Sequence, residues 1–142
     1  MAGPPGFFLV IDGPNSVDTS TVAKLVGATL ARCGYPVTIA RKPSDGPPGV
    51  LARTATHEFR GLALACLVAA DRYHHLDQVI RAALRAGNVV VCDRYVPSSL
   101  VSQRLAGVNP AFTAQLNQYA DTPDLTVILT GGPRRSPPRH LG

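Results

Sequence analysis

The stretch that decides the fold of this chain is residues 7–21, FFLVIDGPNSVDTST. It opens with five apolar residues in a row, the pattern of a strand buried on both faces of a parallel sheet. A loop containing Gly13 follows, and residues 22–31 then place apolar side chains at helical spacing. A strand, a loop and a helix in this order are the setting in which phosphate-binding loops occur. Residues 7–31 therefore predict the first unit of an α/β fold.

The loop itself matches the phosphate-binding pattern G-x-x-x-x-G-K-[ST] only in part. Gly13 opens it, and Ser20 stands where a hydroxyl would hold magnesium. Asp18 replaces the second glycine, and Thr19 replaces the lysine that contacts the phosphates. Because Asp18 adds negative charge beside an anion site, we expect the loop to keep its shape while its phosphate chemistry is impaired. Taken alone, the segment is more typical of an ordinary turn that binds no ligand, and the rest of the chain reverses that interpretation.

Composition narrows the class of protein. The 142 residues are enough for one domain with a sizeable core, and the net charge of +5 is a modest basic excess. No dense basic run occurs, so we expect an anionic small molecule and no nucleic acid as partner. Residues 1–6 lack a charged leader pattern and the next apolar run is too short for a membrane helix, which predicts a cytoplasmic protein. The three cysteines are widely spaced, which favours buried packing over a zinc or disulfide site.

Further along the chain, strands and helices alternate. Short β-branched or apolar runs predict strands over residues 37–40, 89–92 and 125–129. Helical spacing predicts helices over residues 56–86 (two, breaking near His74 and His75), 98–105 and 110–119, with a loop over 41–49. The adjacent histidines point about 100° apart on a helix, so we interpret them as a surface pair and not as metal ligands. The alternation predicts a parallel, doubly wound sheet with helices on both faces in three layers.

Four blocks of sequence resemble the thymidylate kinase family. Residues 86–99, AGNVVVCDRYVPSS, followed by Gln103, are similar to its strand and D-R-Y-x-x-S-[ST] signature with a trailing glutamine. Residues 67–72, LVAADR, resemble its L-F-A-A-D-R helix, and residues 41–43, RKP, its R-E-P loop. Residues 122–129, TPDLTVIL, resemble its P-D-L-T strand. The blocks follow one another in family order and at family spacing, which is far more specific than the loop alone.

The resemblance implies a P-loop NTPase-like domain over residues 1–130, with strands 7–11 and 89–92 as central neighbours. It implies phosphoryl transfer from ATP-Mg to dTMP or a related pyrimidine nucleoside monophosphate, Mg²⁺ with the nucleotide, and a possible homodimer. The family continues with an arginine-rich lid, a further strand and a helix. Residues 131–142 are a Pro/Arg/Gly tail instead, for which we expect disorder. We therefore interpret the chain as a degenerate, C-terminally truncated relative.

The resemblance also assigns roles to residues. The catalytic candidates are Asp12, Asp93 and Arg94, and the magnesium candidates are Ser20 and Asp93. The loop candidates are Gly13, Asn15, Ser16, Asp18, Thr19, Ser20 and Thr21. The acceptor-nucleotide candidates are Arg41, Arg72, Arg94, Tyr95, Ser98 and Gln103. Each has a structural alternative: Asp93 as a helix cap, Arg72 as a surface arginine paired with Asp71 or Asp77, and Arg41 as an ordinary loop residue.

The departures from the family fall on one side of the reaction. Besides the changes in the loop, Val68 replaces the aromatic of the L-F-A-A-D-R block and Lys42 the acid of R-E-P. The acceptor side is largely kept, whereas ATP-binding features are mostly absent, so ATP is a doubtful ligand. Three hypotheses follow: a weak or inactive thymidylate-kinase-like enzyme, a non-catalytic nucleotide-binding or dimerising relative, and a nucleoside monophosphate phosphohydrolase.

Overall fold

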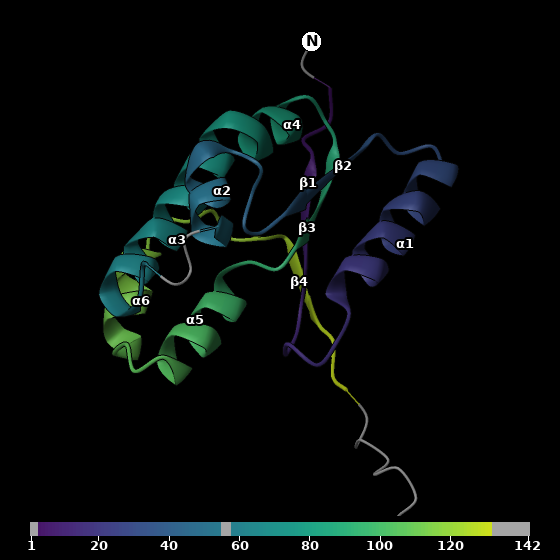
Figure 1. Cartoon of the computed structure of the whole chain (residues 1–142). Helices are drawn as coiled ribbons and strands as arrows, with labels where there is room; N and C mark the ends of the chain where they lie inside the picture. Colours follow the sequence, from purple (N-terminus) through teal and green to yellow (C-terminus); the bar gives the residue numbers. More distant parts are fainter. Residues whose placement is uncertain (1–2, 55–57, 132–142) are drawn as a thin grey trace, which may run out of the picture.

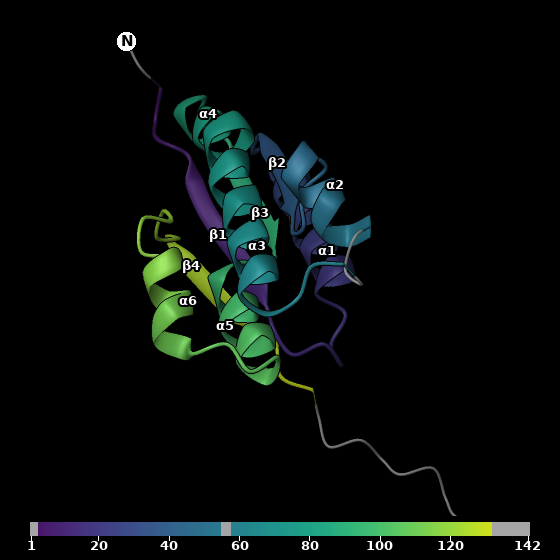
Figure 2. The ribbon, with the colours of Figure 1, turned by 60° about the vertical axis from the view of Figure 1, so that its left-hand side comes forward.

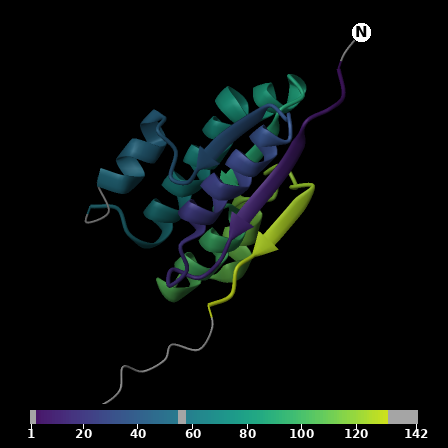
Figure 3. The same ribbon diagram turned by 90° about the vertical axis from the view of Figure 1, so that its right-hand side faces the viewer.

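Four parallel strands form one sheet in the computed structural model, which describes residues 3–54 and 58–131 (Figure 1). The strands are β1 (Phe7–Asp12), β2 (Val37–Arg41), β3 (Val89–Asp93) and β4 (Leu125–Ile128), in the spatial order β2-β3-β1-β4. The predicted strands and the central pairing of β1 with β3 are thus confirmed. β4 lies at one edge of the sheet, beside β1 (Figure 3). This arrangement brings the C-terminal ends of β1 and β3 together.

Helices cover both faces of the sheet, as predicted. The helix α1 (Thr19–Arg32) lies alone on one face, and the other helices lie on the opposite face (Figure 1). They are α2 (Pro47–Thr54), α3 (Gly61–His75), α4 (Arg81–Arg85), α5 (Val96–Leu105) and α6 (Pro110–Leu116). The molecule is therefore a three-layer α/β fold, and no helix among its described residues is long and apolar enough to cross a membrane.

The core is divided by the sheet because successive strand residues point to opposite faces. On β1, Phe8 and Val10 join a cluster on the α3 side, whereas Leu9 and Ile11 pack on the α1 side. Each of these side chains is at least 90% buried, and burying one stabilises the fold by about 1.5–3 kcal/mol. The unbroken apolar run of β1 is thus explained by burial on both faces.

The predicted loop over residues 41–49 and the predicted helices over residues 56–86 each need one correction. α3 does not break at His74 and His75 but continues into α4 through a π-helical turn, Leu76–Ile80, as one rod (Figure 2). A separate helix, α2, also begins at Pro47 inside the predicted loop. Proline is well tolerated in the first turn of a helix because no hydrogen bond is required of its missing N–H there.

Two smaller predictions concern cysteines and the tail. Cys92 is buried as expected, but Cys33 and Cys66 are exposed, so their interpretation as buried packing residues was wrong. Cys33 follows the last residue of α1, and Cys66 lies on an outward-facing position of α3. The tail predicted to be disordered falls, beyond Gly131, outside the described residues, as do residues 55–57.

Candidate functional site

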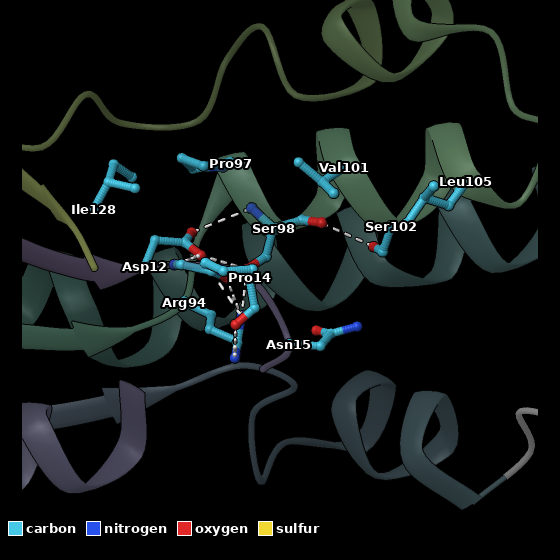
Figure 4. Close-up of a pocket in the computed structure, with 11 residues that line it drawn as sticks. Asp12, Pro14, Asn15, Arg94, Pro97, Ser98, Val101, Ser102, Leu105 and Ile128 are labelled. Carbon is cyan, nitrogen blue, oxygen red and sulfur yellow. Dashed lines mark hydrogen bonds and ion pairs between the residues drawn. The ribbon is translucent and has the colours of Figure 1, made fainter. Parts of the chain in front are cut away.

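Asp12 organises the C-terminal edge of the sheet. Its side chain is 1% exposed and accepts hydrogen bonds from the backbone N–H groups of Gly13 (2.7 Å), Tyr95 (3.0 Å) and Ser98 (3.2 Å). It also accepts one from the Ser98 hydroxyl. These bonds tie the end of β1 to the first turn of α5, with the side chains directed toward one another (Figure 4). The carboxylate therefore positions the loop and the helix start, and its predicted catalytic role stays a prediction.

Arg94 lies against the loop that follows β1. Its guanidinium donates to the carbonyl oxygens of Gly13 (2.7 Å), Pro14 (3.4 Å) and Val17 (3.4 Å), and to Ser98 Oγ (3.2 Å). It also lies 3.9 Å from Asp12. The backbone of Arg94 has φ 69°, a left-handed conformation that is unfavourable for a residue with a side chain. The strained backbone thus presents a cation to the carbonyl groups of the loop.

Three backbone N–H groups in or next to the loop donate to nearby groups of the chain. The N–H of Val17 donates to Pro14 O (3.0 Å), and that of Thr19 donates to Val17 O (3.1 Å). The N–H of Gly13 donates to its neighbour's carboxylate, as described above. A phosphate-binding loop works by directing such N–H groups at the ligand. In this arrangement these donors would have to be released before they could bind a phosphate.

Asp18 occupies the N-cap of α1. Its carboxylate accepts from the N–H (3.0 Å) and from the hydroxyl (2.6 Å) of Thr21. The hydroxyl of Thr21 is the main cause of a pKa of Asp18 below its usual value. A helix N-terminus attracts anions because its first N–H groups lack partners and its dipole is positive there. At α1 the chain's own carboxylate takes this place.

Thr19 and Asp93 meet beneath the loop. The Thr19 hydroxyl donates to Asp93 Oδ1 at 2.6 Å, and both residues are buried. Thr19, at the lysine position of the family pattern, thus makes the contact with Asp93. Magnesium is commonly held by one or two carboxylates, with phosphate oxygens and waters as its other ligands. The hard oxygen donors of Asp93 and the neighbouring hydroxyls fit that role, although the described residues contain no cluster of three or more His, Cys, Asp or Glu for a metal cage.

A cavity of about 380 Å³, which we name the loop pocket, lies between the loop and α5. One wall consists of Asp12, Arg94 and Ser98, and an apolar wall is formed by Pro97, Val101, Leu105 and Ile128 (Figure 4). Gly13 allows this geometry, because a Cβ there would lie 2.9 Å from the carbonyl oxygen of Leu129, which follows β4. The end of β4 therefore approaches the loop closely.

A second cavity of about 200 Å³, which we name the acceptor pocket, lies on the α3 side of the sheet. Its charged lining residues are Lys42, Asp71, Arg72 and Arg94, and its other polar lining residues are Asn15, Tyr95, Ser98, Ser99 and Ser102. Asp71 is buried and is engaged by Ser44, whose N–H donates to it at 2.8 Å and whose hydroxyl also donates to it. The remaining charged groups of the pocket are all cations.

Arg72 is 1% exposed and has only neutral partners. Its guanidinium donates to Ser99 Oγ (2.6 Å) and to Asn117 Oδ1, and it lies 5.3 Å from the ring centroid of Tyr95. Its Nε has no partner among the described residues. Burial lowers the pKa of Arg72. The alternative of a surface arginine paired with Asp71 or Asp77 is therefore wrong, since Asp77 pairs with Arg81 instead.

Lys42 and His75 form a contact that sequence reasoning missed. Lys42 Nζ lies 2.7 Å from His75 Nδ1, although the residues are 33 positions apart. His75 is buried, so the interpretation of a surface histidine pair was wrong for it. Burial lowers the pKa of Lys42 to about 8, and burial together with the positive charge of Lys42 lowers the pKa of His75 to about 4. The only feature of the sequence that pointed to an unusual role for Lys42 was its replacement of the acid in the family's R-E-P loop.

Of the other predicted site residues, only Asn15 and Tyr95 line the acceptor pocket among the residues that the structure describes. Arg41 is exposed and pairs with Asp45 at 3.2 Å, and Gln103 is buried between α5 and α6, where it accepts from the Thr113 hydroxyl (3.0 Å). Asn15, Ser16 and Thr21 are exposed on or beside the loop, and Ser20 is partly exposed. Tyr95 is buried, and its hydroxyl donates to Asp121 O at 2.9 Å. The predicted roles of these residues in binding stay predictions.

Comparison with known sequences gives one consistent result. The sequence model of the family described as thymidylate kinase matches residues 11–138. The "Probable thymidylate kinase" proteins of Pyrococcus horikoshii and Thermococcus gammatolerans are 36% and 37% identical to this chain over 132 and 135 residues. These matches cover 87% of this chain and 64% and 65% of the relatives. The chain thus spans slightly less than two thirds of their length.

Comparison with solved structures agrees at the level of the fold. A crystal structure of thymidylate kinase from Ehrlichia chaffeensis matches with a TM-score of 0.79 and 24% sequence identity. The match covers 89% of this chain and 72% of that chain. The parallel sheet and its helices therefore have the same arrangement in both proteins.

Proposed function

This chain belongs to the thymidylate kinase family, and on that premise we propose that it binds a pyrimidine nucleoside monophosphate such as dTMP in the acceptor pocket. We propose further that it binds ATP-Mg weakly, so that phosphoryl transfer to the monophosphate is weak or lost. The two halves of this proposal rest on different parts of the site.

The observation that carries the first half is the buried guanidinium of Arg72. It lines the acceptor pocket with Lys42 and Arg94, whereas the one carboxylate there, that of Asp71, is already engaged by Ser44. A buried cation without a carboxylate partner is unfavourable unless an anion compensates it. A guanidinium also matches the oxygens of a phosphate in geometry. A monophosphate would therefore balance a pocket lining that holds three cations and one carboxylate.

The second half rests on the loop. Three of its expected phosphate contacts are altered: loop N–H groups donate internally, Asp18 caps α1, and Thr19 carries no ammonium. Arg94, the cation nearest the loop, is directed at its carbonyl oxygens. Phosphoryl transfer depends mainly on positioning the phosphates and neutralising their charge. Each of these changes weakens one of those two functions on the ATP side.

Magnesium is the cofactor implied by the family. The residues that would hold it are Asp93, to which the Thr19 hydroxyl donates, and Ser20, which stands at the family's magnesium position. When bound, the ion would neutralise phosphate charge. The protein's own contribution is to keep the Asp93 carboxylate in place through the bond from Thr19.

The alternative favoured by the state of the loop is a non-catalytic nucleotide-binding relative, acting as the homodimer that the resemblance implies. A phosphohydrolase is less well supported. Activating a water requires a carboxylate with a free oxygen. Asp12 already accepts four hydrogen bonds, which leaves Asp93 alone of the two catalytic carboxylate candidates for that role.

A transfer assay separates these alternatives. The protein is incubated with dTMP and γ-labelled ATP in the presence of Mg²⁺, and labelled dTDP and free phosphate are separated by chromatography. A family member with the complete G-x-x-x-x-G-K-[ST] loop serves as the positive control. We expect little or no dTDP compared with the control. Formation of dTDP at the control's rate would contradict the proposed loss, and release of phosphate from labelled dTMP would favour the phosphohydrolase.

A further inference from the structure

Lys42 is a partly buried ammonium at the start of the segment that follows β2. Its backbone N–H donates to Asp93 O at 3.1 Å, which continues the pairing of β2 with β3. Its side chain lines the acceptor pocket and ends 2.7 Å from His75 Nδ1 on α3. An ammonium can only donate, so Nδ1 must accept and the imidazole must be neutral, with its proton on Nε2. The lowered pKa of His75 agrees with this assignment.

The positive charge of Lys42 has no carboxylate partner. Among the residues that the structure describes, no acid lies within 4.0 Å of its Nζ, and His75 is its one hydrogen-bond partner. An ammonium has three N–H donors, so two of them remain after the bond to His75. Arg72, in the same pocket, likewise has only neutral partners. With Arg94, these two cations make three in the pocket lining against the single carboxylate of Asp71, so the pocket is a site for an anion.

We propose that Lys42 is a phosphate-binding residue of the acceptor pocket, held by neutral His75 so that its remaining N–H donors can bind the phosphate of a nucleoside monophosphate. This inference rests on the proposed function and names a contact within the same site. The resemblance places an acid at this position in the family, so the contact is a property of this chain. Its target is a phosphomonoester dianion, and an unphosphorylated nucleoside gains nothing from it.

The contact between Lys42 and a phosphate can be tested through the pH dependence of dTMP affinity. The charged and titratable groups that face it or its histidine are Asp45, Asp71, Arg72, His74, His75, Cys92, Asp93 and Arg94. Burial raises the pKa of Cys92 to about 12, and an arginine stays charged at any ordinary pH. A phosphomonoester is already a dianion above about pH 7. Between pH 7 and 9, Lys42 is therefore the group whose charge changes, and affinity for dTMP should fall as the pH rises through about 8.

Calorimetric titrations with dTMP and with thymidine test the contact. Lys42→Met keeps a stem of similar length and removes the ammonium, and Lys24→Met is the matched control on the exposed surface of α1, because the chain has only these two lysines. We expect Lys42→Met to lose about tenfold or more in affinity for dTMP, the usual scale for a hydrogen bond to a charged group, with no loss for thymidine. Its dTMP affinity should also be flat between pH 7 and 9. A purely structural role would change both ligands alike.

A spectroscopic measurement on the unaltered protein keeps the test independent of how the variant folds. With lysine labelled by ¹³C at Cε, the two lysine signals are assigned with Lys24→Met, and the Lys42 signal is titrated in free and bound protein. We expect dTMP, and not thymidine, to raise its midpoint by about one pH unit or more. Binding of dTMP without this rise, and without loss in Lys42→Met, would overturn the inference alone. Failure of the unaltered protein to bind dTMP at all would overturn the proposed function as well.

Discussion

Replacing Arg94 with alanine should loosen the loop and destabilise the fold. The guanidinium makes one short bond to Gly13 O (2.7 Å), weaker ones at 3.2–3.4 Å, and an ion pair with Asp12 at 3.9 Å. Hydrogen bonds to charged groups contribute about 1.5–3 kcal/mol, and leaving a buried charge unpaired costs about 3–5 kcal/mol. Because Arg94 is 22% exposed and its ion pair with Asp12 is long, we use the lower end of the range for an unpaired buried charge. Arg94→Ala should lower the free energy of unfolding by about 3 kcal/mol.

Arg94→Gly is the matched control for the backbone. It loses the same side-chain contacts but relieves the left-handed conformation at φ 69°. That conformation costs about 1–2 kcal/mol for a residue with Cβ, offset in part by the greater freedom of glycine when unfolded. The glycine variant should therefore be about 1 kcal/mol more stable than the alanine variant.

Urea unfolding followed by circular dichroism measures both differences. If Arg94→Ala lies within about 0.5 kcal/mol of the unaltered protein, as substitutions at an unconstrained surface do, the guanidinium does not hold the loop. If the alanine and glycine variants unfold at the same urea concentration, the left-handed backbone is not a source of strain.

Three further outcomes follow from the site. Asp18→Gly combined with Thr19→Lys should raise ATP-Mg affinity about tenfold in calorimetry, because it removes a like charge and adds an ammonium. The control Asp18→Asn keeps the N-cap and should recover only the part of the gain that is due to charge. If the double variant gains no affinity, the defect in ATP binding lies elsewhere in the protein. Arg94→Ala should weaken dTMP binding about tenfold or more, and unchanged binding would remove Arg94 from the acceptor site. Because the pKa of His75 falls from about 6.5 when unfolded to about 4 when folded, its contribution to stability is full above pH 6.5 and is lost as the pH falls toward 4. His75→Gln should flatten that part of a urea-stability profile against pH, and an unchanged profile would mean that another group titrates.

The sheet could be predicted from the sequence because its signal is local. Residues of β1 and β3 are buried on both faces, so their apolar runs are unbroken, and their central pairing follows from the right-handed crossover rule and the resemblance. The helix α2 was missed because its Pro-Pro-Gly start reads as a loop, although proline suits the first turn of a helix. The cap at Asp18 had a usable signal, since an aspartate directly before a helical pattern is a favoured N-cap.

The contacts of the acceptor pocket could not be predicted from local sequence patterns. Lys42 meets His75, and Arg72 meets Asn117, across 33 and 45 positions of sequence, and each contact depends on how α3 packs on its neighbours. The motif blocks singled out Arg72 as a candidate but did not show that it is buried with only neutral hydrogen-bond partners. The same blocks could not show that Arg41 turns outward to Asp45.

The central claim is that this chain keeps a site for a nucleoside monophosphate and has lost much of its site for ATP. Separate calorimetric titrations of the unaltered protein with dTMP and with ATP-Mg, at one pH and ionic strength, test it most directly. The cations of the acceptor pocket and the altered loop predict that dTMP binds more tightly than ATP-Mg. Tight binding of ATP-Mg with no measurable binding of dTMP would contradict the account.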